Sequence, residues 1–567
     1  MAKPPAFTNT RVLIIGGGIS GMAMAIELIT RYSIREIVII EKSGGFGGTW
    51  RDNVYPGAAC DVFSSLYSYS FAQKFDFTRT LPGQEEILTY LTDVAQEYKL
   101  YQHARFNSSV RKMEWNDDQL KWYTTVTIDG GKDSEYSTSY KVVSDYVISA
   151  IGQLCKPKGF DIPGLAGFEG RVMHTARWDR GLDLTGKKVA IVGTGATSAQ
   201  VVPEIAPITK HLTVCQRNPG FVIPRHDNEL SPWQRWLRAN VPLVRKRIRA
   251  ENMNFRELFH QAVTQADSKY ADLMRQMNNG LLEKQLSDRP DLQEKVKPRY
   301  NPGCKRTVIT NDYYPTLKRP NVDLETSDIE KLTKNGIKFQ GIDEVRDIDV
   351  LILATGFDTF NFLGDLHIVG REGQTLDQIW PNGVAKALKG IAIPEIPNFG
   401  MLYGPNTNLS HNSLILVIEA QARCLAAMIN RVFTVRRNAG NGTLAVWPKK
   451  EVTERHWEKL QDRLQNTSFS DPACSSWWKR HDGIIVNNWP GTAIDYQRLL
   501  EEIKWQDFDA TGSAKSAFNS EVSKSGSQTV PRVMEEAWLS RSSLLAIVLG
   551  GLAAGVTLHR MWRLQCM

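Results

Sequence analysis

The sequence predicts an α/β fold with two dinucleotide-binding, Rossmann-like domains, one inserted into the other, plus a helical insertion. Three observations lead to this prediction. Two glycine-rich turns, beginning at Gly16 and Gly193, each follow a short β-branched apolar run and precede a helical pattern. A third apolar run, residues 350–353, follows Asp349 and is typical of a strand that returns from the second unit to the first. The length of 567 residues exceeds what one hydrophobic core usually holds.

Charge and cysteine content exclude several classes of protein. The net charge of +8 is modest for this length, and the densest basic run, residues 244–249, is expected on a solvated helix face. Nucleic acid binding is therefore not expected. The seven cysteines are scattered and include no C-x-x-C pair, which favours reduced thiols in the cytosol over a disulfide framework or a metal site. The first residues lack the apolar segment of a secretory signal.

The first glycine-rich turn has the full dinucleotide-binding pattern. An apolar strand, residues 11–15, leads into G-x-G-x-x-G, and residues 22–30 continue as a helix. Glycines permit a tight turn and bring backbone N–H groups close to a pyrophosphate at the helix N-terminus. The next strand ends in Glu41, whose carboxylate can accept hydrogen bonds from ribose hydroxyls. The turn residues expected to bind this cofactor are Gly16, Gly18, Ser20 and Gly21.

The second turn departs from the pattern at one position. Ser198 replaces the third glycine, and it is small enough to preserve close packing of helix on strand. The following strand ends in Arg217, where a site for NAD would have an acid. A guanidinium there can pair with a 2′-phosphate, which favours NADPH over NADH. The residues expected to bind this second cofactor are Gly193, Thr194, Gly195, Ala196, Thr197, Ser198, Gln200 and Arg217.

The segment between the two units, residues 168–179, has the pattern F-x-G-x-x-x-H-x-x-x-W-D. It resembles the fingerprint of type I Baeyer–Villiger monooxygenases, although a linker with one packed His and one packed Trp is the plain alternative. The resemblance extends over about residues 10–500 in at least six motifs, including G-G-T-W before Arg51 and Y-P-G-x-x-C-D, which ends at Asp61. The fingerprint positions are Phe168, Gly170, His174, Trp178 and Asp179. We expect His174 and Trp178 to couple cofactor binding to the position of the domains.

The resemblance implies a division into domains. An FAD domain would comprise residues 1–155 and 350–507, and an NADPH domain, residues 156–349, would lie between them. Its helical insertion, residues 230–297, would cover the substrate cleft. The FAD contacts implied in this family, beyond the first turn, are Gly48, Thr49, Trp50, Asp61 and Tyr67, with the backbone of Val110 near the adenine.

Lys305 and Arg306 would carry the remaining cofactor binding and the chemistry. A lone Lys-Arg pair is usually a solvated surface feature, but here it lies within further sequence that resembles the family. By that resemblance Lys305 binds the 2′-phosphate and Arg306 reaches over the flavin. A permanently charged guanidinium can stabilise an anionic peroxide without donating a proton. Asp61 would hold Arg306 by charge pairing, so Arg306 and Asp61 are the expected catalytic residues.

The implied reaction is the insertion of one oxygen atom of O₂ next to a ketone carbonyl, giving an ester or lactone through a C4a-peroxyflavin. FAD and NADPH would be the cofactors, and the setting would be secondary metabolism. Three alternatives stay open. They are an N- or S-oxygenating flavin monooxygenase, a flavin reductase or oxidase that releases peroxide, and a membrane-tethered protein that binds flavin without turnover.

The C-terminal part changes in composition. Residues 508–533 are rich in Ser, Gly, Lys and Ala, which predicts a flexible linker. Residues 534–567 include the apolar run 542–558, bracketed by Arg541 and Arg560. As a helix this run spans about 25 Å, slightly short of a hydrocarbon core of about 30 Å. We expect a single-pass membrane anchor with the catalytic domain in the cytosol; a helix docked on the globular body is the alternative.

Overall fold

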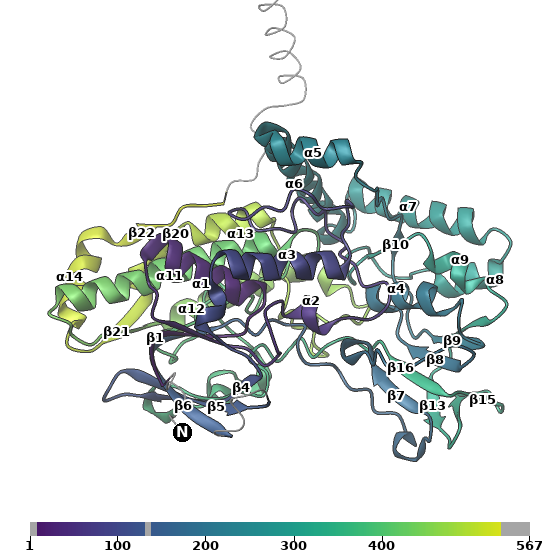
Figure 1. The fold of residues 1–567 in the computed structure, drawn as a ribbon, viewed down its shortest axis with the longest axis horizontal. Helices are drawn as coiled ribbons and strands as arrows, with labels where there is room; N and C mark the ends of the chain where they lie inside the picture. Colours follow the sequence, from purple (N-terminus) through teal and green to yellow (C-terminus); the bar gives the residue numbers. More distant parts are fainter. Residues whose placement is uncertain (1–7, 131–137, 534–567) are drawn as a thin grey trace, which may run out of the picture.

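A computed structural model describes residues 8–130 and 138–533 of the protein and shows two sheets, each with its own helices (Figure 1). The first sheet has eight strands in the order β17-β4-β5-β6-β1-β2-β3, with β18 paired to β6. Its strands are β1 (Asn9–Ile15), β2 (Ile37–Ile40), β3 (Ala104–Arg105), β4 (Ser108–Asn116), β5 (Lys121–Ile128), β6 (Ser139–Ser149), β17 (His367–Val369) and β18 (Phe399–Met401). Strands from both ends of the chain therefore share one sheet.

The predicted apolar run forms the centre of this sheet. In β1, Val12 to Ile15 are buried, and the strand pairs in parallel with both β2 and β6. A strand buried on both faces needs an uninterrupted apolar run, which explains the absence of alternation in its sequence. β4, β5 and β6 pair antiparallel, and β5 alternates buried with half-buried residues because only one of its faces meets the core.

The second sheet has five parallel strands in the order β12-β9-β8-β16-β7. They are β7 (Arg171–His174), β8 (Lys188–Val192), β9 (His211–Cys215), β12 (Val322–Glu325) and β16 (Val350–Leu353). A three-stranded antiparallel sheet, β13 (Ile329–Leu332), β14 (Gly336–Phe339) and β15 (Val345–Asp347), lies next to it in the chain. Two doubly wound units, each with one glycine-rich turn, confirm the predicted fold class.

Helices cover both sheets. Over the first lie α1 (Ile19–Tyr32), α3 (Gln84–Glu97) and α11 (Leu414–Asn438), with α12 (Lys450–Gln465) and α13 (Ala493–Leu500) nearby. α1 packs on α11, and their apolar residues belong to the largest buried cluster. In the second unit α4 (Ala196–Ile205) and α9 (Tyr313–Leu317) pack together. The short helices α2 (Thr49–Asp52) and α10 (Leu376–Ile379) lie in loops.

Four helices occupy the region where a helical insertion is expected. They are α5 (Pro232–Asn240), α6 (Pro242–Thr264), α7 (Lys269–Leu286) and α8 (Pro290–Val296). They lie between the two-residue strands β10 (Val222–Ile223) and β11 (Val308–Ile309), which pair with each other. α6 also reaches the first unit, because the Arg249 guanidinium donates to the Ser68 carbonyl at 3.2 Å.

Residues 508–533 are folded, so the prediction of a flexible linker is wrong. β21 (Phe508–Thr511) pairs with β19 (Ala445–Pro448), α14 (Lys515–Ser525) follows, and β22 (Ser527–Thr529) pairs with β20 (Glu502–Lys504). The composition is polar because only a few residues of this segment are buried. Phe518, the buried residue of α14, is 2% exposed and packs against Trp505, and Ala514, Val530 and Val533 are also buried.

The tail prediction for residues 534–567 lies outside the described residues. Within residues 8–130 and 138–533, no helix is long and apolar enough to cross a bilayer.

We expect Phe518→Ala to lower the free energy of unfolding by about 3–5 kcal/mol, because the truncation leaves a cavity beside Trp505. Thermal or urea unfolding followed by tryptophan fluorescence would measure the loss. Asn519→Ala, at the exposed neighbouring position, is the matched control. Equal stability of the two variants would restore the linker interpretation.

Candidate active site

The two glycine-rich turns have the same local geometry. Gly16 and Gly193 adopt φ values of +112° and +116°, a region that favours glycine. A Cβ atom on Gly16 would lie 2.4 Å from the Ala150 carbonyl oxygen, and one on Gly193 would lie 2.5 Å from that of Ala354. Each turn thus passes against the chain that leaves a neighbouring parallel strand, where only a glycine fits.

The helices after these turns begin without side-chain caps. Neither α1 nor α4 has a side-chain hydrogen bond at its N-cap or an acidic residue in its first turn. Their first N–H groups and the positive end of each helix dipole are therefore available to a phosphate. This arrangement fits a dinucleotide at each turn, and it includes the predicted residues Ser20, Gly21, Ala196 and Thr197.

Glu41 lies directly against the first turn. Its carboxylate accepts hydrogen bonds from the N–H groups of Gly17 at 2.6 Å and Ser43 at 2.7 Å, and the residue is 4% exposed. The N–H of Ser108, at the start of β4, donates to the Glu41 carbonyl at 3.0 Å, which brings Val110 of that strand into the same region. The predicted adenosine-side residues are thus assembled around one turn.

The loop that follows is packed onto the glycine turn. Gly48 has φ of +51°, and a Cβ atom there would lie 2.8 Å from the Cα atom of Gly18. α2 begins immediately afterwards at Thr49, and the Trp50 indole N–H donates to the Tyr67 hydroxyl at 2.9 Å. The four residues predicted from this loop to contact the flavin therefore lie together beside the turn.

The predicted catalytic pair is formed. The Arg306 Nε and Nη2 atoms donate to the two Asp61 carboxylate oxygens at 2.8 and 2.7 Å, a bidentate geometry. Their side chains are 28% and 24% exposed. Burial alone would raise the pKa of Asp61, but the charge and hydrogen bonds of Arg306 outweigh it and lower that pKa. Burial alone would lower the pKa of Arg306, and Asp61 in turn raises it.

A second guanidinium, which the sequence did not single out, binds the backbone of Asp61 and adds its positive charge near the carboxylate. The Arg256 Nη2 atom donates to the Asp61 carbonyl oxygen at 3.0 Å, and its Nε atom has no hydrogen-bond partner among the described residues. Arg256 is 6% exposed, and burial lowers its pKa to about 10. The charge of Asp61 is thus shared between two cations, which leaves the cluster net positive.

Arg256 could have been found from its helical position. The buried face of α6 includes Met253, Arg256 and Val263, so a basic side chain stands among apolar ones. Charged residues are rarely buried without a partner. The same helix presents Glu257, whose carboxylate lies 2.7 Å from the Asn412 amide nitrogen, so α6 is fixed to the first unit on both sides of Arg256.

The predicted phosphate-binding residues of the second turn come together. Burial and the nearby charge of Arg217 lower the pKa of Lys305 to about 8. The Lys305 ammonium lies 5.3 Å from the centre of the Tyr300 ring, and the Thr194 hydroxyl donates to the Asn218 carbonyl at 3.1 Å. Arg217 and Lys305 are neighbouring cations, and the charged form of Lys305 is destabilised. A bound anion would stabilise both charges.

Gln200 and Ser198 have positions that differ from those of the other turn residues. The Gln200 amide donates to the Ala59 carbonyl at 3.0 Å and accepts from the Tyr55 hydroxyl at 3.0 Å, so it ties α4 to the loop that ends at Asp61. Ser198 is fully buried, as close helix–strand packing requires. Gly195 is the N-cap of α4.

The two connections between the units run side by side. The N–H of Lys158, in the outgoing segment, donates to the Gly356 carbonyl at 2.9 Å. The N–H of Asp358, in the returning segment, donates to the Lys156 carbonyl at 2.9 Å. The two segments that join the units are therefore hydrogen-bonded to each other.

The fingerprint residues surround that crossing. His174 ends β7, its ring lies edge-on to Phe357 with centroids 6.2 Å apart, and burial lowers its pKa. Trp178 packs on the core of the second unit together with Tyr55 of the first. Asp179 accepts from the Gly181 N–H at 3.0 Å. Phe168 is packed in the core, and a Cβ atom on Gly170 would lie 2.3 Å from its ring.

The expectation of reduced thiols is wrong for one pair. Cys304 and Cys474 form a disulfide with Cα atoms 6.5 Å apart, while Cys60, Cys155 and Cys215 are free. The 170 residues between the paired cysteines hide the contact from any spacing rule. The bond fixes the residue next to Lys305 to the C-terminal half of the chain.

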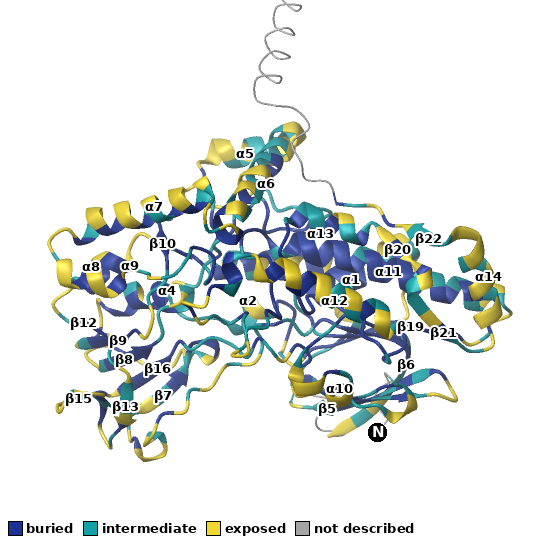
Figure 2. Cartoon of the chain, turned by 180° about the vertical axis from the view of Figure 1, so that it is seen from behind, coloured by how far each residue is buried: buried dark blue, intermediate teal, exposed yellow. Residues whose placement is uncertain are grey.

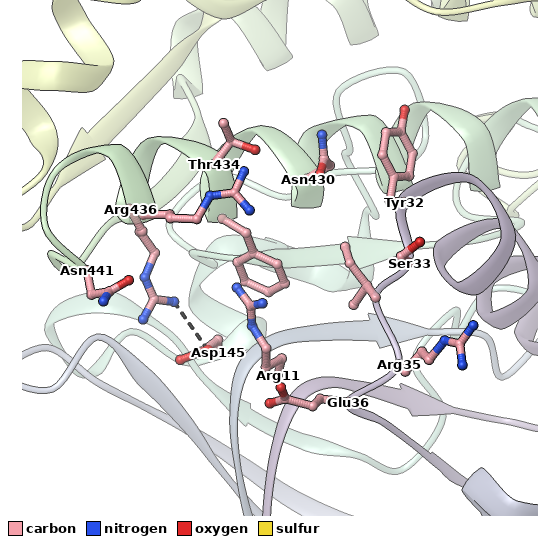
Figure 3. A pocket seen from close by; sticks show the side chains of 13 residues that line it. Arg11, Tyr32, Ser33, Arg35, Glu36, Asp145, Asn430, Thr434, Arg436 and Asn441 are labelled. Atoms are coloured by element: carbon pink, nitrogen blue, oxygen red, sulfur yellow. Dashed lines mark ion pairs between the residues drawn. The ribbon is translucent and has the colours of Figure 1, made fainter.

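A cavity elsewhere has no part in this site. It has a volume of about 570 Å³ and lies at the amino ends of β1 and β2, opposite the glycine turn. Arg11, Asp145 and Arg436 line it, and the Arg436 and Asp145 side chains are 3.3 Å apart (Figure 3). Two of its cations have acidic or aromatic neighbours, since Arg436 pairs with Asp145 and Arg11 lies over the Phe433 ring.

Comparison with known proteins assigns the family. The profile of the flavin-binding monooxygenase-like family matches residues 9–391. The FAD-binding monooxygenase ktnD of Aspergillus niger is 41% identical over 549 residues, 97% of this chain and 88% of the relative. A Baeyer–Villiger monooxygenase of Streptomyces coelicolor is 36% identical over 88% of this chain and 92% of its own length.

Solved structures agree with this assignment. An oxidised steroid monooxygenase bound to NADP aligns with a TM-score of 0.74 at 26% identity, covering 92% of this chain and all of the other. Cyclohexanone monooxygenase from Rhodococcus bound to NADP⁺ aligns with a TM-score of 0.75 at 24% identity and supports the fold. The resemblance read from the motifs is confirmed, and the chain belongs to the flavin-binding monooxygenase-like family, together with the Baeyer–Villiger monooxygenase of Streptomyces coelicolor.

Proposed function

We propose that the protein is a Baeyer–Villiger monooxygenase that uses FAD, NADPH and O₂ to convert a ketone into an ester or lactone. The observation that carries the proposal is the Arg306–Asp61 ion pair, which lies where the two nucleotide-binding units meet. The relatives named Baeyer–Villiger monooxygenase support the reaction class.

The first turn fits FAD and the second fits NADPH. Around the first we assign the glycines of the turn, Glu41, the loop from Gly48 to Trp50, and Tyr67. Around the second we assign Thr194, with Arg217 and Lys305 holding the 2′-phosphate. When bound, reduced FAD supplies the electrons that activate O₂. The uncapped helices α1 and α4 supply N–H groups for the two pyrophosphates.

Arg306 contributes a fixed positive charge to the reacting oxygen. Its raised pKa means that it stays protonated at any working pH and stabilises a negative oxygen without giving up a proton. Asp61 holds the guanidinium in place by two hydrogen bonds. Arg256 acts as a positioning residue, because it keeps Asp61 compensated when Arg306 turns toward a ligand.

The substrate we propose is an apolar ketone. Phe255 and Leu258, on α6 beside Arg256, are 54% and 48% exposed, and Phe255 lies 6.0 Å from Phe63, two residues after Asp61. An apolar rim around a cationic centre suits a ketone whose polarity is confined to one carbonyl. The setting in secondary metabolism stays a prediction.

We also propose that residues 534–567 anchor the protein to a membrane. Support comes from the sequence alone, in the apolar run 542–558 with flanking cations. The catalytic part would face the cytosol. The Cys304–Cys474 disulfide does not favour that side, since disulfides are uncommon in cytosolic proteins.

Arg306→Ala should lower ester formation by roughly 100- to 1000-fold, the usual effect of removing one charge-stabilising donor. Mass spectrometry of products from cyclic, aryl and terpenoid ketones would measure it, with an amine and a sulfide in the same panel. Arg306→Lys should recover little, because an ammonium cannot replace the bidentate contact. Ester formation by Arg306→Ala near the wild-type rate would refute the role of Arg306. Oxygenation of the amine or sulfide alone would refute ketone oxygenation.

NADPH binding should weaken as pH rises through about 8, because Lys305 loses its charge there. The lowered pKa means that the cation is present below about 8 and absent above it. The KM for NADPH should therefore rise in that range, while that for NADH stays flat. Lys305→Met should abolish the pH dependence of the difference between the KM values for NADPH and NADH. An identical pH profile for both nucleotides would show that Lys305 does not contact the phosphate.

Arg256→Leu should lower the ester formed per NADPH and raise the release of hydrogen peroxide. The reason is that Asp61 then holds Arg306 too tightly for it to serve the reacting oxygen. Arg256→Lys should restore part of the yield, but only below the lower pKa of a buried lysine. Arg247→Leu, the same charge change on α6, is the control. An equal yield of ester per NADPH in Arg256→Leu, Arg256→Lys and Arg247→Leu would show that Arg256 has a packing role only.

A further inference from the structure

Helix α5 and the start of α6 expose three large apolar side chains. Trp233 is 64% exposed, Trp236 is 51% exposed, and their rings are stacked with centroids 5.0 Å apart. Leu243, at the beginning of α6, is 78% exposed. Single exposed apolar residues are common, but an exposed stacked pair of tryptophans with a third apolar residue nearby in the chain marks an interaction surface.

The same segment has an unusual charge. Residues 232–250 include six basic side chains and no acidic one, namely Arg235, Arg238, Arg245, Lys246, Arg247 and Arg249. Two of them interact within the protein, since Arg249 is buried and donates to the Ser68 carbonyl and Arg247 pairs with Glu251. Lys246 is exposed, and Arg235, Arg238 and Arg245 are half-buried. We call Trp233, Trp236 and Leu243 together with these four cations the α5–α6 surface.

The α5–α6 surface lies at one end of the molecule. α5 projects beyond the body of the protein in both views and is largely exposed (Figures 1 and 2). The described chain ends at Val533 on that same side. From there 34 residues follow, and their sequence contains the apolar run 542–558.

We propose that the α5–α6 surface rests on a bilayer that contains anionic lipids. Tryptophan prefers the interface between headgroups and acyl chains, and each Lys or Arg near an anionic surface contributes about 1 kcal/mol. The proposed tail anchor would bring the protein to the same membrane. The contact of the α5–α6 surface with lipid does not depend on the ketone chemistry.

Charge argues against the other occupants. A second copy would bring the same cations face to face, and like charges across an interface are costly. The apolar run 542–558 of this chain has no acidic residue and is flanked by Arg541, Arg560 and Arg563, so the run offers the cations of the surface no countercharge; the two acidic residues of the tail, Glu535 and Glu536, come before it. An anionic lipid surface satisfies both the apolar and the basic residues.

The test is sedimentation of the full-length protein with two kinds of vesicle, phosphatidylcholine alone and phosphatidylcholine with about one-third phosphatidylserine. Three double or single variants are compared with the wild type. Trp233→Glu with Trp236→Glu alters the α5–α6 surface, and Leu545→Glu with Leu549→Glu alters the tail. Leu273→Glu, at a site on α7 that is 50% exposed, is the matched control.

We expect the α5 variant to lose binding to the acidic vesicles about tenfold or more, with Leu273→Glu unchanged. Added salt should weaken the wild type on acidic vesicles only. Ketone turnover in lipid-free buffer should be the same in the α5 variant and the wild type, which separates a failure of this inference from a failure of the proposed reaction.

Three results would overturn the inference. In the first, the α5 variant binds both vesicles like the wild type while the tail variant does not, so the tail alone makes the contact. In the second, the α5 variant loses binding equally on both vesicles, so the surface does not distinguish anionic from neutral lipid. In the third, the α5 variant changes the oligomeric state without lipid, so the surface joins two copies.

Discussion

One residue, Asp61, holds together three parts of the chain that lie far apart in sequence. Arg306, from the second unit, binds the Asp61 carboxylate through two hydrogen bonds, and Arg256, from α6, donates to the Asp61 backbone carbonyl. A buried charge without a partner costs several kcal/mol, so the arrangement fixes α6 and the second unit against the first. Two guanidiniums and one carboxylate still leave a positive balance. The positive charge of this cluster is therefore balanced only when an anion binds. An oxygen that gains negative charge during the reaction is such an anion.

The same dependence on an arriving anion recurs at the second turn. The charge of Arg217 disfavours the charged form of Lys305, and the disulfide ties the neighbouring residue Cys304 to Cys474. Arg306 follows Lys305 directly in the chain, so we expect a phosphate bound at Lys305 to affect the position of the Arg306 guanidinium. The paired crossing at Gly356 and the packing of His174 on Phe357 confine the remaining freedom to a small relative movement of the units. The fingerprint residues His174 and Trp178 make packing contacts beside this crossing, and their coupling of cofactor binding to domain position stays a prediction.

The sequence predicted the features that local rules determine. Gly16 and Gly193 need positive φ, and the apolar run of β1 needs burial on both faces, so both were visible as patterns. The pairing of Arg306 with Asp61 was predicted through family resemblance. Cys304 with Cys474, and Arg256 with Asp61, are contacts across 170 and 195 residues that no local rule contains. The prediction for residues 508–533 failed for a different reason, because a few buried apolar residues, Phe518 and Val530 among them, supply burial that the average composition does not reveal.

Helix α6 connects the α5–α6 surface with the site around Asp61. Leu243 and Lys246, near its N-terminus, are exposed, and Arg256 on its buried face donates to the Asp61 backbone carbonyl. Thirteen residues of helix at 1.5 Å each place these ends about 20 Å apart. An apolar ketone concentrates in a bilayer, and the apolar residues Phe255 and Leu258, on either side of Arg256 in the sequence, are exposed on α6. A surface that holds α5 against lipid would therefore also shorten the route of such a substrate to Arg306. The insertion would then serve two purposes with one helix, since the residues that face outward set the location and those that face inward set the charge.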